Sequence, residues 1–228
     1  MADTQAKTGS RIVFWDWNGT LCDDLQVSLD AVNELLRVKE LPPISLEQYY
    51  SYVDTPISRF YERLFDLNEV TMDEIAAHYR SYYNAHLPED CLMKGVRQVL
   101  DELKERGAVQ VILSSAHRVS IEERARRLGI LPYFSDILAA DDWMAQSKEE
   151  RTRVFLSQNG CGTDTSRVWF IGDALHDADV AKACGCGDRC ILLPFGHQSE
   201  EDLRKTGAVF CSDWAAIPQL IYEKDFDT

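Results

Sequence analysis

The sequence predicts an α/β protein in which a doubly wound parallel sheet carries a small inserted helical domain. From residue 95 onward, short apolar runs alternate with amphipathic segments of helical period, the pattern of parallel strands joined by crossover helices. A further apolar run stands alone near the start, and residues 22–92 show helical periods without a convincing strand. We therefore expect a core of residues 1–21 and 93–228 and a helical insertion of residues 22–92.

The first apolar run ends at a carboxylate. Arg11–Trp15 is followed at once by Asp16 and then by Asn18-Gly19-Thr20. An apolar, β-branched and aromatic run closed by Gly is typical of a buried strand that leads into a sharp turn. Ligands of open α/β sheets bind at the carboxyl ends of the strands, where a carboxylate can serve as a nucleophile or metal ligand. The alternative is that Asp16 caps the next helix.

The insertion is predicted to contain four helical segments, each with a recognisable start or stop. A Ser or Thr followed three residues later by Gln or Glu opens a helix as a capping box, and Leu-Pro or Thr-Pro pairs interrupt one. The segments are Asp23–Val38, one that starts after Ser45, Ile57–Phe65, and one that runs from Thr71 to Leu87.

Strands and helices alternate through the remainder of the chain. Helices are expected where apolar residues recur every three or four positions and a Gly or polar residue ends the pattern. Strands are expected at the short apolar runs between them. The predicted helices are Gly95–Arg106, Arg118–Leu128, Lys148–Gln158, Ala178–Cys184 and Asp213–Tyr222, and the predicted strands are Val109–Leu113, Asp136–Ala140, Val168–Gly172 and Cys190–Leu193.

Composition narrows the possible partners. The formal net charge is −14 and 45% of the residues are hydrophobic, so a globular protein is expected, without a surface that would bind nucleic acid or an anionic membrane. The first ten residues are polar and no apolar run approaches the roughly 18 residues that span a bilayer. We expect a cytoplasmic protein, monomeric or homodimeric.

Seven cysteines and no export signal favour reduced thiols over disulfides. A zinc site at Cys184, Cys186 and Cys190, completed by Cys161 or Cys211, is an alternative. The spacing matches none of the usual zinc pairs, so small residues in a tight turn are the favoured interpretation.

Several predicted strands end in polar groups. Asp173 follows Val168–Gly172, with Asp177 four residues later, and Ser114 follows Val109–Leu113. Because parallel strands bring their carboxyl ends to one edge, Asp16, Ser114 and Asp173 should converge there. Close carboxylates repel one another unless a cation joins them, and hard oxygen ligands suit magnesium. Lys148, which begins a helix, could neutralise the remaining charge. Individually these residues could also be helix caps or a solvated lysine.

These motifs resemble those of the haloacid dehalogenase superfamily, whose phosphatases carry DxDGT, a Ser or Thr after a strand, a Lys, and GDxxxD. Here the corresponding residues are DWNGTL at Asp16–Leu21, then Ser114, Lys148, and GDALHD at Gly172–Asp177. The resemblance covers essentially the whole chain, and the position of the helical insertion is similar to that in the phosphoglycolate phosphatase-like branch, with its C1-type cap and Rossmann-like core.

The resemblance implies a magnesium-dependent phosphatase that acts on a small phosphorylated metabolite. Asp16 would attack phosphorus and form an aspartyl-phosphate. The family's Mg²⁺ would be held by Asp16, the backbone carbonyl of Asn18, Asp173 and Asp177. Ser114 would donate to a phosphoryl oxygen, and Lys148 would pair with Asp16 and the phosphoryl group. Dehalogenation, which needs no metal, is disfavoured by the acidic pair.

One residue departs from the family pattern. Phosphatases of the family usually have Asp where this chain has Asn18, and that Asp protonates the leaving oxygen and later activates water. An amide cannot shuttle a proton, and loss of a general acid/base costs roughly 10²- to 10⁴-fold. The chain could act on acyl or aryl phosphates, could use His176, Asp23 or His117 instead, or could bind phosphate and magnesium without turnover. Asn18→Asp is expected to speed hydrolysis of alkyl phosphates.

Substrate contacts are expected from the segment Asp16–Leu21, from the serines after the strand Val109–Leu113, from the segment Gly172–Asp177 and from the insertion. Arg59, which follows the Thr55-Pro56 break, is the first choice among the cationic residues of the insertion, ahead of Arg63 and Arg80. A surface arginine paired with a neighbouring acid is the alternative. The candidate substrate-binding residues are Thr20, Ser115, Arg59 and His176; His197 could contact the substrate, although a loop histidine without a role is favoured.

Overall fold

The computed structural model describes residues 9–140, 147–161 and 164–223. Six parallel strands form one sheet in the order β3-β2-β1-β4-β5-β6, so β1 lies at its centre. The strands are β1 (Ile12–Trp15), β2 (Val109–His117), β3 (Phe134–Ala140), β4 (Val168–Gly172), β5 (Cys190–Leu192) and β6 (Val209–Phe210). The predicted α/β class is confirmed.

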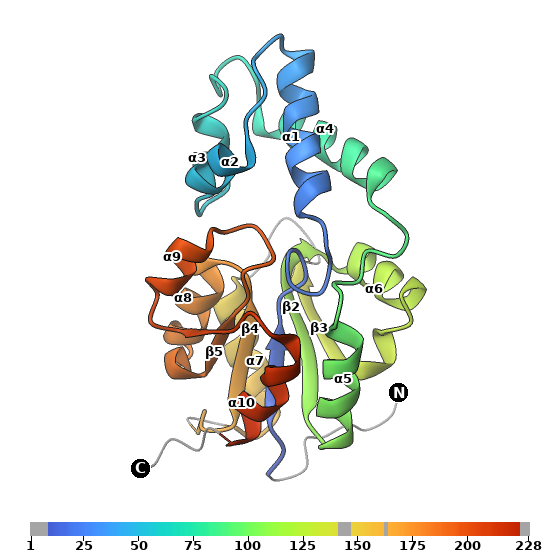
Figure 1. Ribbon diagram of the computed structural model, residues 1–228, viewed down its shortest axis with the longest axis vertical. Coiled ribbons are helices and arrows are strands. Elements are labelled where there is room, and N and C mark those ends of the chain that lie inside the picture. The colour runs from blue at the N-terminus through green and yellow to red at the C-terminus, as the bar shows by residue number, and fades with distance from the viewer. Residues whose placement is uncertain (1–8, 141–146, 162–163, 224–228) are drawn as a thin grey trace.

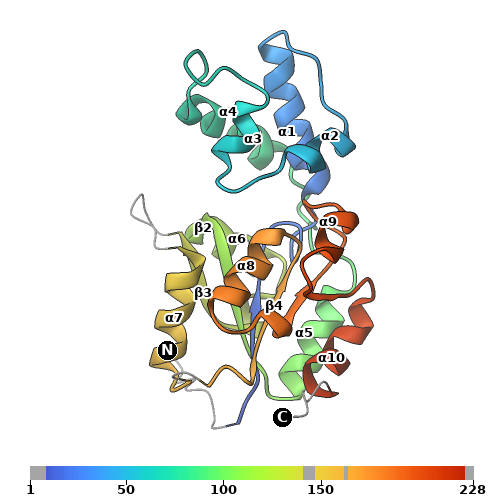
Figure 2. The same cartoon turned by 90° about the vertical axis from the view of Figure 1, so that its left-hand side faces the viewer.

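Helices cover both faces of the sheet (Figures 1 and 2). Val13 and Trp15 of β1 pack into one apolar cluster with residues of α5, α6 and α10, whereas Ile12 and Phe14 pack into another with residues of α7, α8 and α9. This alternation follows from the two-residue period of a strand. The helices are α5 (Val96–Glu105), α6 (Arg118–Arg127), α7 (Lys148–Gln158), α8 (Leu175–Ala183), α9 (Glu200–Arg204) and α10 (Ile217–Glu223).

Four helices between β1 and α5 lie beyond the carboxyl ends of the strands (Figures 1 and 2). They have an apolar cluster of their own, which includes Leu35, Phe60 and Ile75. Ser45 forms the expected capping box with Gln48, and the side chain of Thr71 accepts from the backbone of Glu74. The helices are α1 (Leu25–Val38), α2 (Leu46–Tyr52), α3 (Ser58–Glu62) and α4 (Met72–His86).

The chain enters and leaves this insertion through two adjacent segments. Cys22 and Leu92 form an isolated antiparallel bridge, and the backbone N–H of Asp23 donates to the carbonyl of Cys91 over 2.7 Å. Met93 N in turn donates to the carbonyl of Leu21. The incoming connection therefore leaves the loop that follows β1, and the returning connection is hydrogen-bonded to it before α5 begins.

Several element boundaries differ from the sequence prediction. β2 continues past Leu113 to His117, because its pairing with β3 resumes after a register shift although the side chains turn polar. α8 begins at Leu175, three residues earlier than expected, since Asp177 accepts from the backbone N–H of Ala174 at its start. α3 ends at Glu62. The short elements α9 and β6 have too few residues to show a period and were not predicted.

Two expectations about composition can be compared with the structure. Within the described ranges, no helix combines the length and the hydrophobicity needed to cross a membrane. The seven cysteines are free thiols, and among the residues that the structure describes the only group arranged to hold a metal ion consists of aspartates. The zinc alternative at Cys184, Cys186 and Cys190 therefore finds no support in the described residues.

Candidate active site

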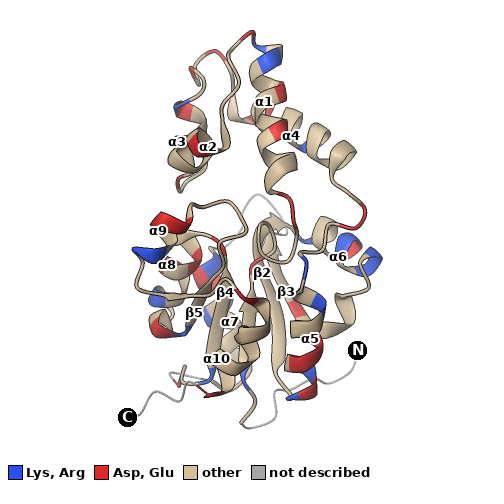
Figure 3. Ribbon diagram, in the orientation of Figure 1, with Lys and Arg blue, Asp and Glu red and all other residues tan. Residues whose placement is uncertain are grey.

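Three carboxylates meet at the carboxyl end of the sheet. Asp16 directly follows β1, Asp173 directly follows β4, and Asp177 lies in the first turn of α8. Each offers an oxygen atom, and the three atoms all lie within 4.8 Å of one another. The register explains the proximity: Trp15 pairs with Ile171, and Asp16 N donates to the Ile171 carbonyl over 2.9 Å. Figure 3 shows acidic residues at the edge of the sheet that faces the insertion.

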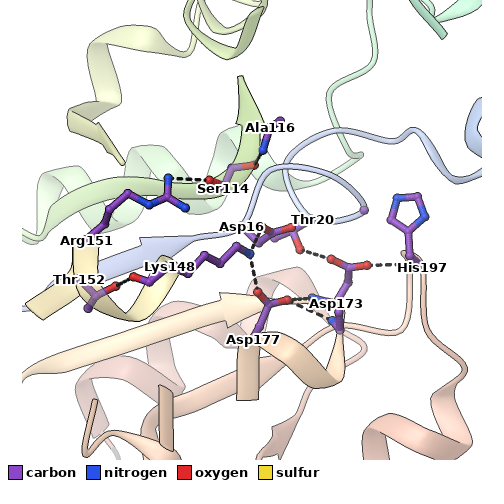
Figure 4. A network of polar contacts seen from close by, with 12 residues as sticks. Asp16, Thr20, Ser114, Ala116, Lys148, Arg151, Thr152, Asp173, Asp177 and His197 are labelled. Carbon is purple, nitrogen blue, oxygen red and sulfur yellow. Dashed lines mark hydrogen bonds and ion pairs between the residues drawn. The ribbon is translucent and has the colours of Figure 1, made fainter. Parts of the chain in front are cut away.

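Lys148 joins two of the three carboxylates. Its Nζ donates to Asp16 Oδ1 over 2.6 Å and to Asp177 Oδ1 over 2.9 Å (Figure 4). Lys148 is the first residue of α7, and its side chain is only 6% exposed. We refer to Asp16, Asp173, Asp177 and Lys148 as the carboxylate cluster.

The carboxylate cluster carries more negative than positive charge. Burial raises the pKa of Asp16 to about 8, and Asp177 and Asp173 act in the same direction against the opposing effect of Lys148. Burial likewise raises the pKa of Asp173 to about 6. One ammonium group cannot neutralise three carboxylates, so the cluster favours a bound cation. Its hard oxygen donors fit an ion such as Mg²⁺.

Small residues and two donors fix Asp173 in this arrangement. Thr20 Oγ1 donates to Asp173 Oδ1 over 2.9 Å, and the backbone N–H of His197 donates to Asp173 Oδ2 over 2.6 Å (Figure 4). A Cβ at Gly19 or at Gly196 would collide with the same carboxylate, and Gly19 also has a φ of +71°, which favours glycine. Thr20, predicted to bind substrate, is fully buried and its hydroxyl proton is engaged by Asp173.

Ser114 lies near the nucleophile position on the neighbouring strand. It is buried in β2, where Ile112 pairs with Trp15. Its hydroxyl accepts from the backbone of Ala116 over 3.1 Å, and its carbonyl accepts from Arg151 over 2.9 Å (Figure 4). The Ser114 hydroxyl proton is not used in that bond. The next residue, Ser115, is exposed.

A second set of polar side chains lies where the insertion contacts the core. Asp24 Oδ2 accepts from Asn18 Nδ2 and from the hydroxyl of Tyr83, while Asp24 Oδ1 accepts from Gly19 N and pairs with His197 Nε2 over 3.1 Å. His197 Nδ1 in turn lies 2.9 Å from the hydroxyl of Tyr49. We call Asn18, Asp24, Tyr49, Tyr83 and His197 the bridging cluster.

Asp24 and His197 form an ion pair within the bridging cluster. Although burial opposes the ionised form, His197 and the hydrogen-bond donors around Asp24 hold the pKa of its carboxyl below the usual range. Burial would also lower the pKa of His197, but the Asp24 carboxylate raises it to about 9. Both side chains are thus charged at neutral pH, and the pair is neutral overall.

The other predicted residues lie outside these two clusters. His176 is partly buried on α8, where burial lowers its pKa. Arg59 is exposed on α3, 3.8 Å from Asp54. Asp23 and His117, considered as replacements for the missing acid, are both exposed. Among the hydrogen bonds and ion pairs of the described residues, none joins these four to the carboxylate cluster, although His176 directly precedes Asp177 and interacts electrostatically with it and with Lys148.

The sequence analysis did not single out Asp24, Tyr49 or Tyr83 as site residues, and it favoured no role for His197. The doubled acid Asp23-Asp24 directly after the first motif was the available signal for Asp24. No periodicity identifies which of the insertion's tyrosines face the core, because that depends on how the insertion is placed.

Comparisons with known proteins identify the family. The sequence model of the family described as haloacid dehalogenase-like hydrolase matches residues 13–188. A 5'-nucleotidase of Pseudomonas aeruginosa is 26% identical over 212 residues, which cover 92% of this chain and 94% of the relative. A phosphoglycolate phosphatase of Neisseria gonorrhoeae is 27% identical over 230 residues, which cover 92% and 91%.

Solved structures show the same fold. A haloacid dehalogenase-like hydrolase of Streptococcus pneumoniae aligns with a TM-score of 0.79 at 18% identity, over 93% of this chain and 99% of that one. A predicted phosphatase of Clostridium acetobutylicum aligns with a TM-score of 0.76 at 22% identity, over 94% and 99%. The resemblance inferred from the motifs is confirmed, and the chain belongs to the haloacid dehalogenase-like hydrolase family.

Proposed function

We propose that this protein is a magnesium-dependent phosphatase that hydrolyses a small phosphorylated metabolite through transient phosphorylation of Asp16. The observation that carries the proposal is the carboxylate cluster: Asp16 lies 2.6 Å from the buried Lys148 ammonium and shares a three-aspartate site with Asp173 and Asp177. Relatives that match more than nine-tenths of the chain are a 5'-nucleotidase and a phosphoglycolate phosphatase.

The metal would be held by the side chains of Asp16, Asp173 and Asp177 and by the backbone carbonyl of Asn18. When bound, Mg²⁺ supplies charge neutralisation between the Asp16 carboxylate and the phosphoryl oxygens. Thr20 and the His197 N–H keep Asp173 oriented for this role. The backbone N–H groups of Asp173 and Ala174 do the same for Asp177, over 3.2 and 3.1 Å.

In the first step the Asp16 carboxylate oxygen forms a bond to phosphorus, and the bond from phosphorus to the leaving oxygen breaks. Lys148 pairs with Asp16 and with the transferring phosphoryl group, which carries negative charge throughout. The Ser114 hydroxyl donates to a phosphoryl oxygen. In the second step water attacks phosphorus, the bond to Asp16 breaks, and phosphate leaves.

Proton transfer to the leaving oxygen is the weak point of this site. The Asn18 amide cannot supply a proton, so substrates whose leaving group is already a weak base are favoured, such as acyl or aryl phosphates. His176 is the alternative donor, and it lies in the same turn as Asp173 and Asp177. Ser115 and Arg59 are proposed to contact the remainder of the substrate, with Arg59 exchanging Asp54 for a substrate anion.

A metal-dependent assay tests the proposal. The purified protein would be incubated with p-nitrophenyl phosphate, an acyl phosphate and a panel of phosphorylated metabolites, with Mg²⁺ or with a chelator. Release of phosphate only with Mg²⁺, and its loss in Asp16→Asn, is expected. Equal rates for the parent and Asp16→Asn would contradict the proposal.

A further inference from the structure

Asp24 is the most heavily hydrogen-bonded carboxylate near the nucleophile, although no metal role is assigned to it. Its side chain is fully buried. Oδ1 accepts from Gly19 N over 2.8 Å and pairs with His197 Nε2, and Oδ2 accepts from Asn18 Nδ2 and from the Tyr83 hydroxyl. Each oxygen therefore has two donors, one of them from the Asn18-Gly19 turn.

This arrangement fixes which way the Asn18 amide faces. Only the NH₂ group of an amide can donate to a carboxylate, so the assignment of its nitrogen and oxygen follows from the Asp24 contact. Among the described residues, both contacts of the Asn18 side chain use Nδ2, one to Asp24 and one to Tyr83 over 3.1 Å. Asn18 Oδ1 is left as an acceptor that faces away from Asp24.

The same carboxylate oxygen, Asp24 Oδ2, also accepts a hydrogen bond from a helix of the insertion. Tyr83 lies on α4, and its hydroxyl donates to Asp24 Oδ2 over 2.8 Å. Its ring stacks on that of Tyr79 with centroids 5.6 Å apart, whereas the Tyr79 hydroxyl donates to Ser28 on α1 over 2.8 Å. Of these two stacked tyrosines, Tyr83 thus hydrogen-bonds to Asn18 in the loop after β1 and to Asp24, whereas the Tyr79 hydroxyl donates within the insertion.

We propose that Asp24 is a positioning residue that orients the Asn18 amide, and that it joins this orientation to the placement of helix α4 through Tyr83. This inference rests on the proposed function. Held in this way, Asn18 Oδ1 accepts a hydrogen bond from the water that attacks phosphorylated Asp16. The oxygen of that water bonds to phosphorus, the bond between Asp16 and phosphorus breaks, and the water proton passes to a phosphate oxygen, because the amide cannot take it.

The Asp24→Asn variant perturbs one half of this network. Gly19 N is a fixed backbone donor, so the new amide oxygen is expected to stay beside it and beside His197. The new NH₂ group then faces Asn18 Nδ2, where donor meets donor, and the Tyr83 hydroxyl, which can no longer donate to residue 24 at this position. The Asn18 amide loses its fixed orientation while the side chain at residue 24 keeps its size.

A double-mutant cycle on Asp24 and Asn18 provides the test. Asp24→Asn is expected to lower kcat on p-nitrophenyl phosphate by about 10-fold with less than about a threefold change in KM, because the attack of water is affected and substrate binding is not. In the Asn18→Ala background the same substitution should change kcat by less than about twofold. An equal loss in both backgrounds would overturn the proposal.

Quenched-flow mass measurement of the protein separates this inference from the proposed function. If the parent forms a phosphoryl adduct on Asp16, Asp24→Asn should accumulate more of it, since its breakdown is slowed. Failure to detect any adduct, together with an active Asp16→Asn variant, would refute the proposed function. An adduct that forms in the parent and decays equally fast in Asp24→Asn would refute the inference alone.

Tyr83→Phe and Tyr79→Phe form a matched pair that decides the matter if Asp24→Asn does not fold. Each removes one hydroxyl from neighbouring turns of α4. Tyr83→Phe is expected to lower kcat by about threefold or more, and Tyr79→Phe to leave kcat unchanged. Equal effects of the two substitutions would contradict the link between α4 and Asn18.

Discussion

The carboxylate cluster and the bridging cluster lie side by side, but their positive and negative charges are balanced differently. The carboxylate cluster combines three carboxylates with one ammonium group; burial raises the pKa of Asp16 and of Asp173, and a cation is favoured. The bridging cluster combines one carboxylate with one imidazolium and neutral donors, so its charges are already matched. The first cluster is arranged to bind a cation, and the second is arranged to hold the insertion against the core.

The difference also concerns what each cluster connects. All four members of the carboxylate cluster come from the core: the ends of β1 and β4 and the first turns of α7 and α8. The bridging cluster takes Tyr49 from α2 and Tyr83 from α4, together with His197 from the loop after β5. Replacing a carboxylate of the first cluster should therefore affect chemistry more than stability, and replacing a charged member of the second should do the reverse.

Asp16→Asn tests this contrast with the largest expected effect. Loss of the nucleophile should reduce the rate by at least about 10³-fold. In metal-free buffer at neutral pH its melting temperature should equal or exceed that of the parent, because a buried carboxylate with a raised pKa has been removed. Asp24→Asn, measured by the same thermal scan, should melt lower, since His197 loses its anion. A comparable destabilisation of both variants would contradict this contrast between the two clusters.

Lys148→Met is expected to be the most destabilising change. It leaves the buried Asp16 and Asp177 without their shared cation, and breaking such a pair typically costs about 3–5 kcal/mol. Arg153→Met is the control on the same helix, because the Arg153 side chain is 59% exposed and its pair with Glu149 is worth about 0–1 kcal/mol. Denaturant titration measures both, and added Mg²⁺ should restore part of the loss only for Lys148→Met.

The contrast explains what could be predicted from sequence. Asp16 and Asp173 were placed correctly at one edge because each ends an apolar run, and parallel strands bring such ends together. Lys148 was expected nearby as the first residue of a helix, whereas the metal role of Asp177 came from the resemblance to the family. Apart from that resemblance, these inferences need only local pattern and the parallel topology, which is also why β1, α7 and β4 were predicted with nearly correct bounds.

The bridging cluster needed information that local pattern does not contain. Asp24 and Asp23 are adjacent acids, yet Asp24 is buried and Asp23 exposed, and only the path of the chain into α1 distinguishes them. Tyr83 and Tyr49 are two among many tyrosines of the insertion, and the side that faces the core depends on tertiary packing. His197 was seen as a loop residue, because its partner Asp24 is 173 positions away.

The pH dependence of stability should reveal the bridging cluster. Because Asp24 raises the pKa of His197 from 6.5 to about 9, the stabilisation is complete below the unfolded value and is lost as the pH rises through about 9, on the order of 3 kcal/mol. With saturating Mg²⁺ to keep the aspartates ionised, the melting temperature should fall by several degrees between pH 6.5 and about pH 9.

His197→Gln keeps the backbone donor to Asp173 and removes the titrating ring. Its melting temperature should be lower than that of the parent near pH 6.5 and should change less above it. His117→Gln, at an exposed position, serves as the control and should retain the parent's slope. A slope that persists unchanged in His197→Gln would show that another group produces it.

Asn18→Asp is expected to have the smallest effect of these substitutions. The sequence alone predicted that it would speed hydrolysis of alkyl phosphates, and the contact with Asp24 revises that expectation. The donors around Asp24 keep that residue ionised, so a carboxyl group at position 18 would carry the proton and donate it to Asp24, as the amide does now. The new acid would thus be engaged, and the ratio of rates on alkyl and aryl phosphates should stay within about threefold of the parent's.

In Asn18→Asp combined with Asp24→Asn, the amide at position 24 donates instead and the acid is released toward the substrate. The ratio should then rise by about 10-fold or more, and an equal rise in the single variant would show that Asp24 does not control the side chain at position 18.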